Sequence, residues 1–267
     1  MRLARVFPRR TALTPCDPLA FVGDPPLFLP DADEVHVSVA FTWDIAEGRR
    51  LASAWGQYLA VKLGGPAFDD AGNGFTPGRY VKPGVTFTSR GCNNECPWCL
   101  VPPREGRLRE LPIVEGNLVQ DNNLLQCSGP HLERVFAMLR TQRAVQFTGG
   151  LDARLLDADT ADAIRGLRLR QLFLACDTDS GLAPLERAVK LLQLPRDKVR
   201  CYVLLAFHTT IDECEERLRA VWRAGAMPFA QLYQPPDRLI RYSQDWRHLQ
   251  RTWNRPAAMK AHMREAA

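Results

Sequence analysis

The chain has 267 residues, of which 46% are hydrophobic and 24% are charged, and it contains 18 glycines and 20 prolines. These proportions are those of a globular protein, so they exclude a disordered, collagen-like or coiled-coil chain. Lys and Arg total 35 against 30 for Asp and Glu, a formal net charge of +5. No run of about 18 apolar residues predicts a membrane span, and the N-terminus lacks the apolar core of a secretory signal. We therefore expect a cytoplasmic protein with no membrane contact.

Residues 1–80 are predicted to form a small Rossmann-like unit. Residues 1–30 are rich in Pro and Arg, which predicts irregular structure. A strand, a helix and a second strand are then expected at residues 34–41, 45–59 and 60–65, and together they make a βαβ unit. Residues 66–80 are dense in Gly, Pro, Asp and Asn, so they predict a linker and a domain boundary.

Residues 81–236 alternate between apolar runs and helical patterns. Strands are expected at residues 85–89, 117–120, 144–150, 170–176, 200–207 and 227–233. Helices are expected at residues 131–143, 159–168, 183–193 and 211–224. Runs that are apolar at nearly every position indicate strands buried on both faces. The region is therefore predicted to be an α/β domain whose parallel sheet is either doubly wound or curled toward a barrel.

Residues 237–267 are predicted to form a basic helical tail. The basic residues are Arg238, Arg241, Arg247, Arg251, Arg255, Lys260 and Arg264, and the acidic ones are Asp237, Asp245 and Glu265. Tyr242, Trp246 and Trp253 lie among these charges. Such a segment is typical of nucleic-acid contact by phosphate neutralisation and base stacking. It is also typical of an amphipathic helix that packs its aromatic side chains on the protein body, and this second interpretation is favoured.

Three of the eight cysteines are crowded into one short segment. Cys92, Cys96 and Cys99 form a C-x3-C-x2-C pattern directly after the first strand of the second region. Eight cysteines are too dilute for a disulfide scaffold, and a group of three leaves one thiol over. Three thiolates on one loop suit three corners of a [4Fe–4S] cluster and leave the fourth iron open. A structural zinc site needs a fourth ligand, which no nearby His or second CxxC supplies.

This spacing, with the aromatic Trp98 just before the third cysteine, resembles the signature of the radical S-adenosylmethionine (SAM) superfamily. The resemblance covers roughly residues 81–235 and implies a partial (β/α)6 barrel. It also implies that the three cysteines hold a [4Fe–4S] cluster whose open iron binds the amino and carboxylate groups of SAM. One electron, delivered by a donor such as flavodoxin or ferredoxin, then cleaves SAM to a 5′-deoxyadenosyl radical that abstracts hydrogen from a substrate.

The same resemblance implies cofactor-binding roles for residues beyond the cysteines. Trp98 is expected to line the adenine pocket, with core packing as the alternative. Relatives carry a GGE-like segment after the second strand, and the residues there in this chain are Asp121, Asn122 and Asn123. Their side-chain oxygens can accept hydrogen bonds from the SAM amino group. Asp177, with Asp179 as its rival, is expected to bind the SAM ribose, with a plain turn as the alternative.

Four further residues are candidates for substrate binding, and none is assigned as a catalytic acid or base. Asp152 and Arg154 close the third predicted strand. They are expected either to bind the SAM carboxylate or the substrate, or to form a structural ion pair. Gln231 and Tyr233 alternate with Phe229 along the sixth strand, so the three share one face of the sheet.

The remaining cysteines have no ligand-like spacing and are interpreted as small buried hydrophobes. They are Cys16, Cys127, Cys176, Cys201 and Cys214. Cys127 and Cys176 follow the second and fourth strands, so both are also candidates to face the site.

The N-terminal unit resembles a truncated form of the cobalamin-binding domain that precedes the barrel in many relatives. It contains no D-x-H-x-x-G motif, and His36 lies inside a strand pattern, so cobalamin is not expected. The leading hypothesis is a radical SAM enzyme of unidentified substrate, with RNA or another nucleic acid favoured over a protein or small molecule because of the basic tail. The alternative is a non-catalytic iron–sulfur or nucleic-acid-binding protein that keeps the barrel, which the altered segment 121–123 supports.

Overall fold

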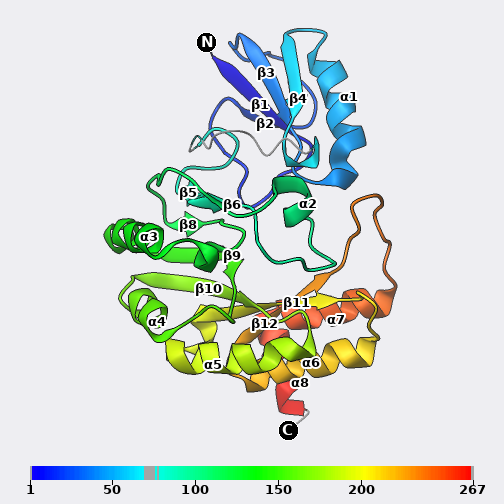
Figure 1. Ribbon diagram of the computed structural model, residues 1–267. Coiled ribbons are helices and arrows are strands. Elements are labelled where there is room, and N and C mark those ends of the chain that lie inside the picture. Colours follow the sequence, from blue (N-terminus) through cyan, green and yellow to red (C-terminus); the bar gives the residue numbers. More distant parts are fainter. Residues whose placement is uncertain (1, 69–75, 77, 266–267) are drawn as a thin grey trace. The chain divides into compact units, whose positions relative to one another are not determined.

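The computed structural model describes residues 2–68, 76 and 78–265, and the chain divides into two compact units (Figure 1). Unit 1 comprises Met1–Val85 with Pro103–Glu105 and Pro235–Leu239. Unit 2 comprises Thr86–Pro102, Gly106–Gln234 and Ile240–Ala267. Each unit has a hydrophobic core of its own. Among the described helices, none combines the length and the apolar composition that crossing a bilayer requires.

Unit 1 is built on a four-stranded parallel sheet in the order β2-β1-β3-β4. Its strands and its α-helix are β1 (Leu3–Phe7), β2 (Ala20–Val22), β3 (Glu34–Ser38), α1 (Ile45–Trp55) and β4 (Ala60–Gly64). The predicted βαβ unit is confirmed in β3, α1 and β4. Trp55 at the end of α1 is fully buried, and its indole N–H donates to the carbonyl of Gly23 at 3.1 Å.

The irregular structure predicted for residues 1–30 is wrong, because β1 and β2 lie there. Arg5 interrupts the apolar residues of β1, and this is what obscures the strand in the sequence. Ala4 and Val6 enter the core, while the buried Arg5 guanidinium binds the Asp17 carboxylate and the carbonyls of Gly78 and Arg79. A charged side chain on one face of a strand is tolerated when such partners satisfy it.

Apart from Val85 of β5, unit 2 contains a six-stranded sheet in which the strands follow one another in chain order, β5-β8-β9-β10-β11-β12. The strands are β5 (Val85–Thr86), β8 (Leu118–Val119), β9 (Val145–Leu151), β10 (Leu169–Ala175), β11 (Val199–Leu205) and β12 (Met227–Leu232). All six lie where strands are predicted, and the pairs from β8 to β12 are parallel. In the described residues β5 and β12 are open edges and no closed barrel forms. The fold class is therefore α/β with parallel sheets.

The four predicted helices of unit 2 are confirmed and lie along one side of this sheet (Figure 1). They are α3 (Gly129–Thr141), α4 (Ala158–Arg165), α5 (Leu182–Leu192) and α6 (Ile211–Arg223). Along β11, Cys201, Val203 and Leu205 are fully buried in the core, whereas Tyr202 and Leu204 between them are only partly buried. Side chains alternate between the two faces of a strand, so one face packs on helices and the other carries Tyr202.

The segment that holds the clustered cysteines is closed at its base by a short antiparallel pair, β6 (Ser89–Arg90) with β7 (Arg109–Glu110). Within the segment lies the short helix α2 (Val101–Glu105). The single strand predicted at residues 85–89 is divided into β5 and β6. At the break, Thr88 turns its backbone N–H and its hydroxyl to the Asp121 carboxylate, at 2.7 and 2.5 Å.

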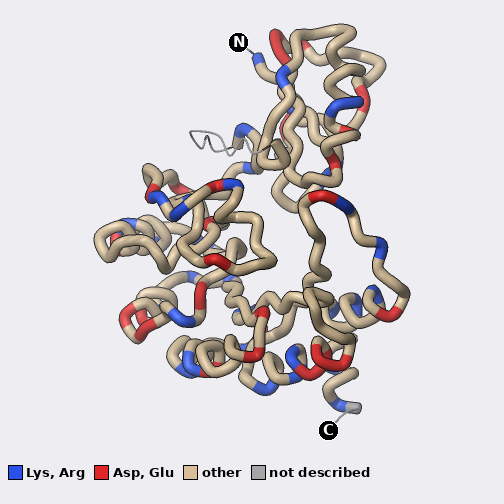
Figure 2. The backbone as a smooth tube through the Cα atoms, turned by 45° about the vertical axis from the view of Figure 1, so that its right-hand side comes forward, with Lys and Arg blue, Asp and Glu red and all other residues tan. Residues whose placement is uncertain are grey.

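The C-terminal segment forms α7 (Gln244–Asn254) and α8 (Pro256–Glu265), and both contribute to the core of unit 2. Trp253 and Met259 are fully buried. The side-chain amide of Asn254 binds the backbone of the edge strand β12, accepting from Ala230 N at 2.7 Å and donating to Ala230 O at 3.0 Å. The predicted packing of the tail on the protein body is therefore confirmed. Arg247, Arg251, Lys260 and Arg264 are exposed, and Figure 2 marks the basic positions along the backbone of these helices.

Candidate functional site

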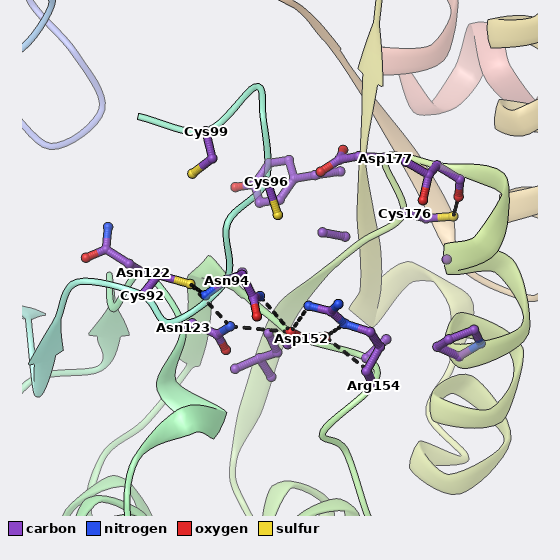
Figure 3. A pocket seen from close by; sticks show the side chains of 18 of the residues that line it. Cys92, Asn94, Cys96, Cys99, Asn122, Asn123, Asp152, Arg154, Cys176 and Asp177 are labelled. Atoms are coloured by element: carbon purple, nitrogen blue, oxygen red, sulfur yellow. Dashed lines mark hydrogen bonds and ion pairs between the residues drawn. The ribbon is translucent and has the colours of Figure 1, made fainter. Parts of the chain in front are cut away.

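A pocket of about 270 Å³ lies in unit 2 where β9 and β10 end (Figure 3). The carboxyl ends of parallel strands are where α/β proteins place their sites. Its lining includes all three clustered cysteines, Cys92, Cys96 and Cys99. Other predicted residues in the lining are Trp98, Asn122, Asn123, Asp152, Arg154, Cys176 and Asp177.

The three cysteines are free thiols that line the same pocket. Cys92 is buried, Cys96 and Cys99 are half-buried, and none of the eight cysteines forms a disulfide. Burial raises the pKa of Cys96, and the neighbouring Cys99 raises it further. No three His, Cys, Asp or Glu side chains in the described ranges converge closely enough to hold a single metal ion. The ligands of an iron–sulfur cube bind different irons, so they are not required to converge on one point.

Backbone N–H groups turn toward two of the sulfurs. Asn94 N lies 3.4 Å from Cys92 Sγ, and Val101 N lies 3.5 Å from Cys99 Sγ. The turn before Cys92 depends on Gly91, which has φ +81°, and a Cβ atom there would overlap the carbonyl oxygen of Arg107. The loop therefore places one backbone N–H donor at each of these two sulfurs.

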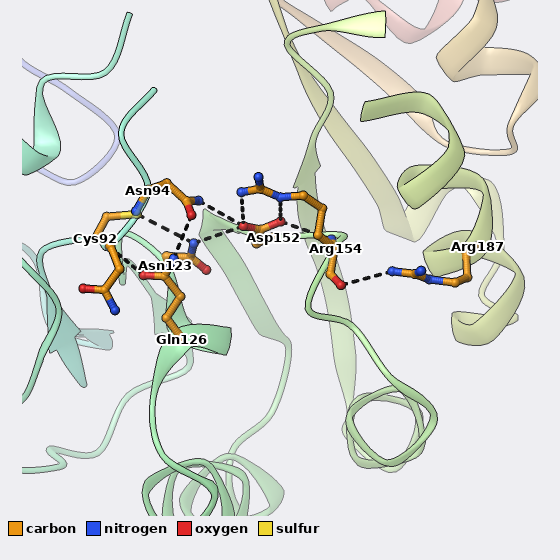
Figure 4. A network of polar contacts seen from close by, with 8 residues as sticks. Cys92, Asn94, Asn123, Gln126, Asp152, Arg154 and Arg187 are labelled. Atoms are coloured by element: carbon orange, nitrogen blue, oxygen red, sulfur yellow. Dashed lines mark hydrogen bonds and ion pairs between the residues drawn. The ribbon is translucent and has the colours of Figure 1, made fainter. Parts of the chain in front are cut away.

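Asp152 and Arg154 form the predicted ion pair and sit beside the cysteine loop (Figure 4). Burial disfavours ionisation of Asp152, but hydrogen bonds from Arg154 and Asn94 outweigh it and lower its pKa to about 2. The Asn94 amide donates to Asp152 Oδ2 at 3.0 Å. Asp152 is thus a carboxylate committed to structural partners. None of the described hydrogen bonds uses Nη1 of Arg154, so this nitrogen remains available to an anion.

The segment of Asp121, Asn122 and Asn123 is only partly directed at the pocket. Asp121 is buried away from it and accepts from Thr88 and Ser89, so it does not take the predicted cofactor-binding position. Asn122 and Asn123 do line the pocket. Asn123 is only 4% exposed, and its Oδ1 is buried without a hydrogen-bond partner in the described residues. A buried acceptor left open in this way is suited to a donor on a ligand.

Gly149 explains how this segment comes to lie at the pocket. A Cβ atom on Gly149 would overlap the backbone oxygen of Asp121, so only a glycine permits β9 to approach this closely. The close contact places the ends of β8 and β9 side by side. It thereby brings Asn123 within 3.4 Å of Asp152 Oδ2.

Asp177 and its predicted rival Asp179 have different environments. Asp177 lines the pocket and accepts from Leu204 N at 3.0 Å. Burial raises its pKa, and hydrogen bonds from Leu204 and Trp98 counteract part of that rise. Asp179 is exposed and pairs with the buried Arg217, with Arg217 Nε 2.9 Å from Asp179 Oδ1. Asp177 is therefore the one of the two that a ligand in the pocket would meet.

Besides Asp121, three predicted residues are not brought to this pocket. Gln231 is exposed on β12, and Tyr233 lies just beyond that strand, where its backbone N–H donates to Leu205 O at 3.0 Å. Cys127 is buried outside the pocket lining, unlike Cys176. Burial raises the pKa of Cys176 to about 12, so its thiol is neutral.

Asn94 and Tyr202 both line the pocket and are not among the residues predicted from the sequence. The Tyr202 hydroxyl donates to the Thr148 carbonyl at 2.8 Å, and burial raises its pKa to about 12. Its ring stacks on Phe173 at 4.5 Å. The signal for Tyr202 was its place in β11 between two buried residues, which sets it on the face opposite the helices. Nothing local in the sequence indicates the contact of Asn94 with Asp152.

Comparison with known proteins gives no family for this chain: no family model matches it, and no curated protein has significant sequence similarity to it.

Proposed function

We propose that the protein is a radical SAM enzyme that holds a [4Fe–4S] cluster and SAM in the pocket of unit 2. The observation that carries this proposal is that Cys92, Cys96 and Cys99 line one pocket together with Asn123, Arg154 and Asp177. When bound, the cluster supplies an electron, taken from a donor such as flavodoxin or ferredoxin, that cleaves SAM and yields a nucleoside radical able to abstract hydrogen from a substrate.

The donor set fits such a cluster. Three thiols on one loop match a cube with one iron left open, and thiolate is the ligand that iron–sulfur clusters take in proteins. The N–H groups of Asn94 and Val101 lie at two of the sulfurs and would stabilise their negative charge.

The remaining polar groups fit the amino acid and ribose ends of SAM. Asn123 Oδ1 is a buried acceptor with an open position and would accept a hydrogen bond from the ammonium group. Arg154 Nη1 would donate to the carboxylate, while its other donors hold Asp152. Asp177 would accept from a ribose hydroxyl, and Trp98, which lines the same pocket, would contact the adenine.

We also propose that the open sheet of unit 2 is a partial (β/α)6 barrel. A barrel of this kind requires the six strands to follow one another in chain order, which is the order from β5 to β12. It also requires helices on one face only, which agrees with the burial of alternate residues along β11.

We propose a nucleic acid, with RNA as the first candidate, as the substrate. Arg247 and Arg251 on α7 and Lys260 and Arg264 on α8 are exposed, and none has an acidic partner among the described residues. Exposed cations without acidic partners bind a phosphate backbone by releasing its counterions.

The experiment that tests the enzyme proposal is anaerobic reconstitution with iron and sulfide, followed by measurement of iron per chain and of 5′-deoxyadenosine formed from SAM under reduction. We expect C92A, C96A and C99A to lose both signals, and the matched control C16A to keep both, because Cys16 is exposed and outside the pocket. Wild-type protein that binds iron without forming 5′-deoxyadenosine would favour the non-catalytic alternative. Wild-type protein that takes up no iron would overturn the proposal.

A further inference from the structure

We infer that Asn123 is a positioning residue for Cys92 and that its side-chain amide sets the reduction potential of the cluster that this thiolate would hold. The inference rests on the proposed function and concerns an interaction particular to this chain. It assigns to Asn123 a role through its nitrogen, in addition to the ligand-facing role of its oxygen.

The geometry directs the amide nitrogen of Asn123 toward a cysteine sulfur and a carboxylate oxygen. Asn123 Nδ2 lies 3.7 Å from Cys92 Sγ and 3.4 Å from Asp152 Oδ2 (Figure 4). An amide nitrogen has two hydrogens, so these two acceptors account for both. The orientation of the amide is thereby fixed, and Oδ1 is turned to the position where it has no partner.

A network of neighbouring side chains prevents this amide from turning away. Asp152 is held by Arg154 on both oxygens and by Asn94 at 3.0 Å. Asn94 is held in turn by the Gln126 amide, which donates to its Oδ1 at 3.0 Å. The network joins the cysteine loop, the residues after β8 and the end of β9, so rotation of Asn123 would break contacts to two of these segments.

The electrostatic consequence follows from the charge on the sulfur. A reduced cluster carries one more negative charge than an oxidised one, and an N–H donor to a ligating sulfur stabilises the reduced state more. Cys92 receives two such donors, one from Asn94 N and one from Asn123 Nδ2. Only the second belongs to a side chain, so substitution can remove it while the backbone donor stays.

The test compares the midpoint potential of the reconstituted cluster, measured by anaerobic spectroelectrochemical titration without SAM, in wild type and four variants. We expect N123L, which keeps a similar volume, to lower the equilibrium constant for one-electron reduction about tenfold, or about 59 mV. We expect N123D to lower it further, because a carboxylate cannot donate and adds negative charge. N123Q, which retains the donor, is expected to lie between N123L and wild type.

The matched control is N117L, since the Asn117 amide donates to Arg143 O at 3.0 Å outside the pocket lining and has no described bond to a cysteine sulfur. We expect its midpoint potential to equal that of wild type. Iron per chain and the melting temperature of the iron-free protein show whether N123L folds. If N123L does not fold, the midpoint potentials of N123Q and N123D decide the outcome. Iron bound to wild type with the same potential in the Asn123 variants would overturn this inference alone. Absence of iron from wild type would overturn the proposed function together with it.

Discussion

The Asp152 carboxylate is bound at both oxygens by the Arg154 guanidinium, with Nε 2.8 Å from Oδ1 and Nη2 2.6 Å from Oδ2. Two parallel hydrogen bonds of this kind fix orientation as well as charge. The Asp152 side chain is only 10% exposed, whereas that of Arg154 is 58% exposed. The pair therefore joins the buried Asp152 carboxylate to the more exposed Arg154. The same carboxylate accepts from the side-chain amides of Asn94 and Asn123.

The first prediction concerns the pH dependence of the stability that Asp152 contributes. Because its pKa falls from 3.8 to about 2 on folding, the folded state binds fewer protons than the unfolded state between these values. The contribution, about 2 kcal/mol by this shift, is present above about pH 4 and is lost as the pH falls through about 2. We expect D152N to be less stable than wild type in urea unfolding at pH 7, with a smaller difference at pH 3. Equal differences at the two pH values would contradict the prediction.

The second prediction concerns Gly149, whose Cβ position is occupied by the backbone oxygen of Asp121. We expect G149A to lower the free energy of unfolding by about 1–3 kcal/mol or more, because backbone atoms on both sides have to shift. The control is G166A, where an added Cβ would meet neighbours no closer than 3.5 Å. Denaturant unfolding measures the free energy of unfolding of both variants. Equal values for the two would show that β9 can move away from Asp121 at no cost, which would contradict the prediction.

The third prediction separates the two aspartates after β10. We expect D177N to weaken SAM binding to the reconstituted protein about tenfold, which is about 1.4 kcal/mol, because a charged acceptor in the pocket is lost. We expect D179N to leave SAM affinity unchanged and to lower stability by about 1 kcal/mol, because it removes the partner of buried Arg217. Isothermal titration and thermal melting measure the two effects. A larger loss of affinity in D179N than in D177N would refute the assignment.

The fourth prediction concerns nucleic-acid binding by α7. We expect R247E/R251E to weaken binding of a structured RNA and to reduce the slope of log K against log salt by about 2, one for each phosphate contact removed. The control R140E/K190E changes exposed cations on α3 and α5. Fluorescence anisotropy at several salt concentrations measures the slopes. If both double variants bind as wild type does, the tail is not a nucleic-acid interface.

The sequence predicted the strands, helices and cysteine loop of unit 2 well because each has a strong local pattern. Three cysteines at a fixed spacing are visible without any tertiary information, and so is an apolar strand. Asp152 and Arg154 are two residues apart, so their ion pair is also a local feature.

What the sequence could not supply depends on contacts between distant segments. Asp121 carries the same side chain whether it faces a ligand or is buried, and only the fold shows that Thr88 and Ser89 use its oxygens. The sequence predicts the strand that carries Gln231, but it does not show how far that strand lies from the pocket, because this distance depends on strand order and register. The sequence does not predict β1, because a charged Arg5 within it argues against a buried strand. The groups that bind Arg5 lie as far along the chain as Arg79, so no local pattern shows them.

The contact of Asn254 with β12 has a consequence for how the C-terminal helices can be studied. An edge strand exposes N–H and C=O groups that can pair with a strand of another molecule, and natural proteins block such edges. Asn254 occupies both backbone groups of Ala230, in the way that a neighbouring strand would. Removal of residues 237–267 would uncover this edge together with the apolar surface under Trp253, so the shortened chain is expected to self-associate. Substitution of single charges on α7 avoids that outcome and keeps the sheet edge shielded.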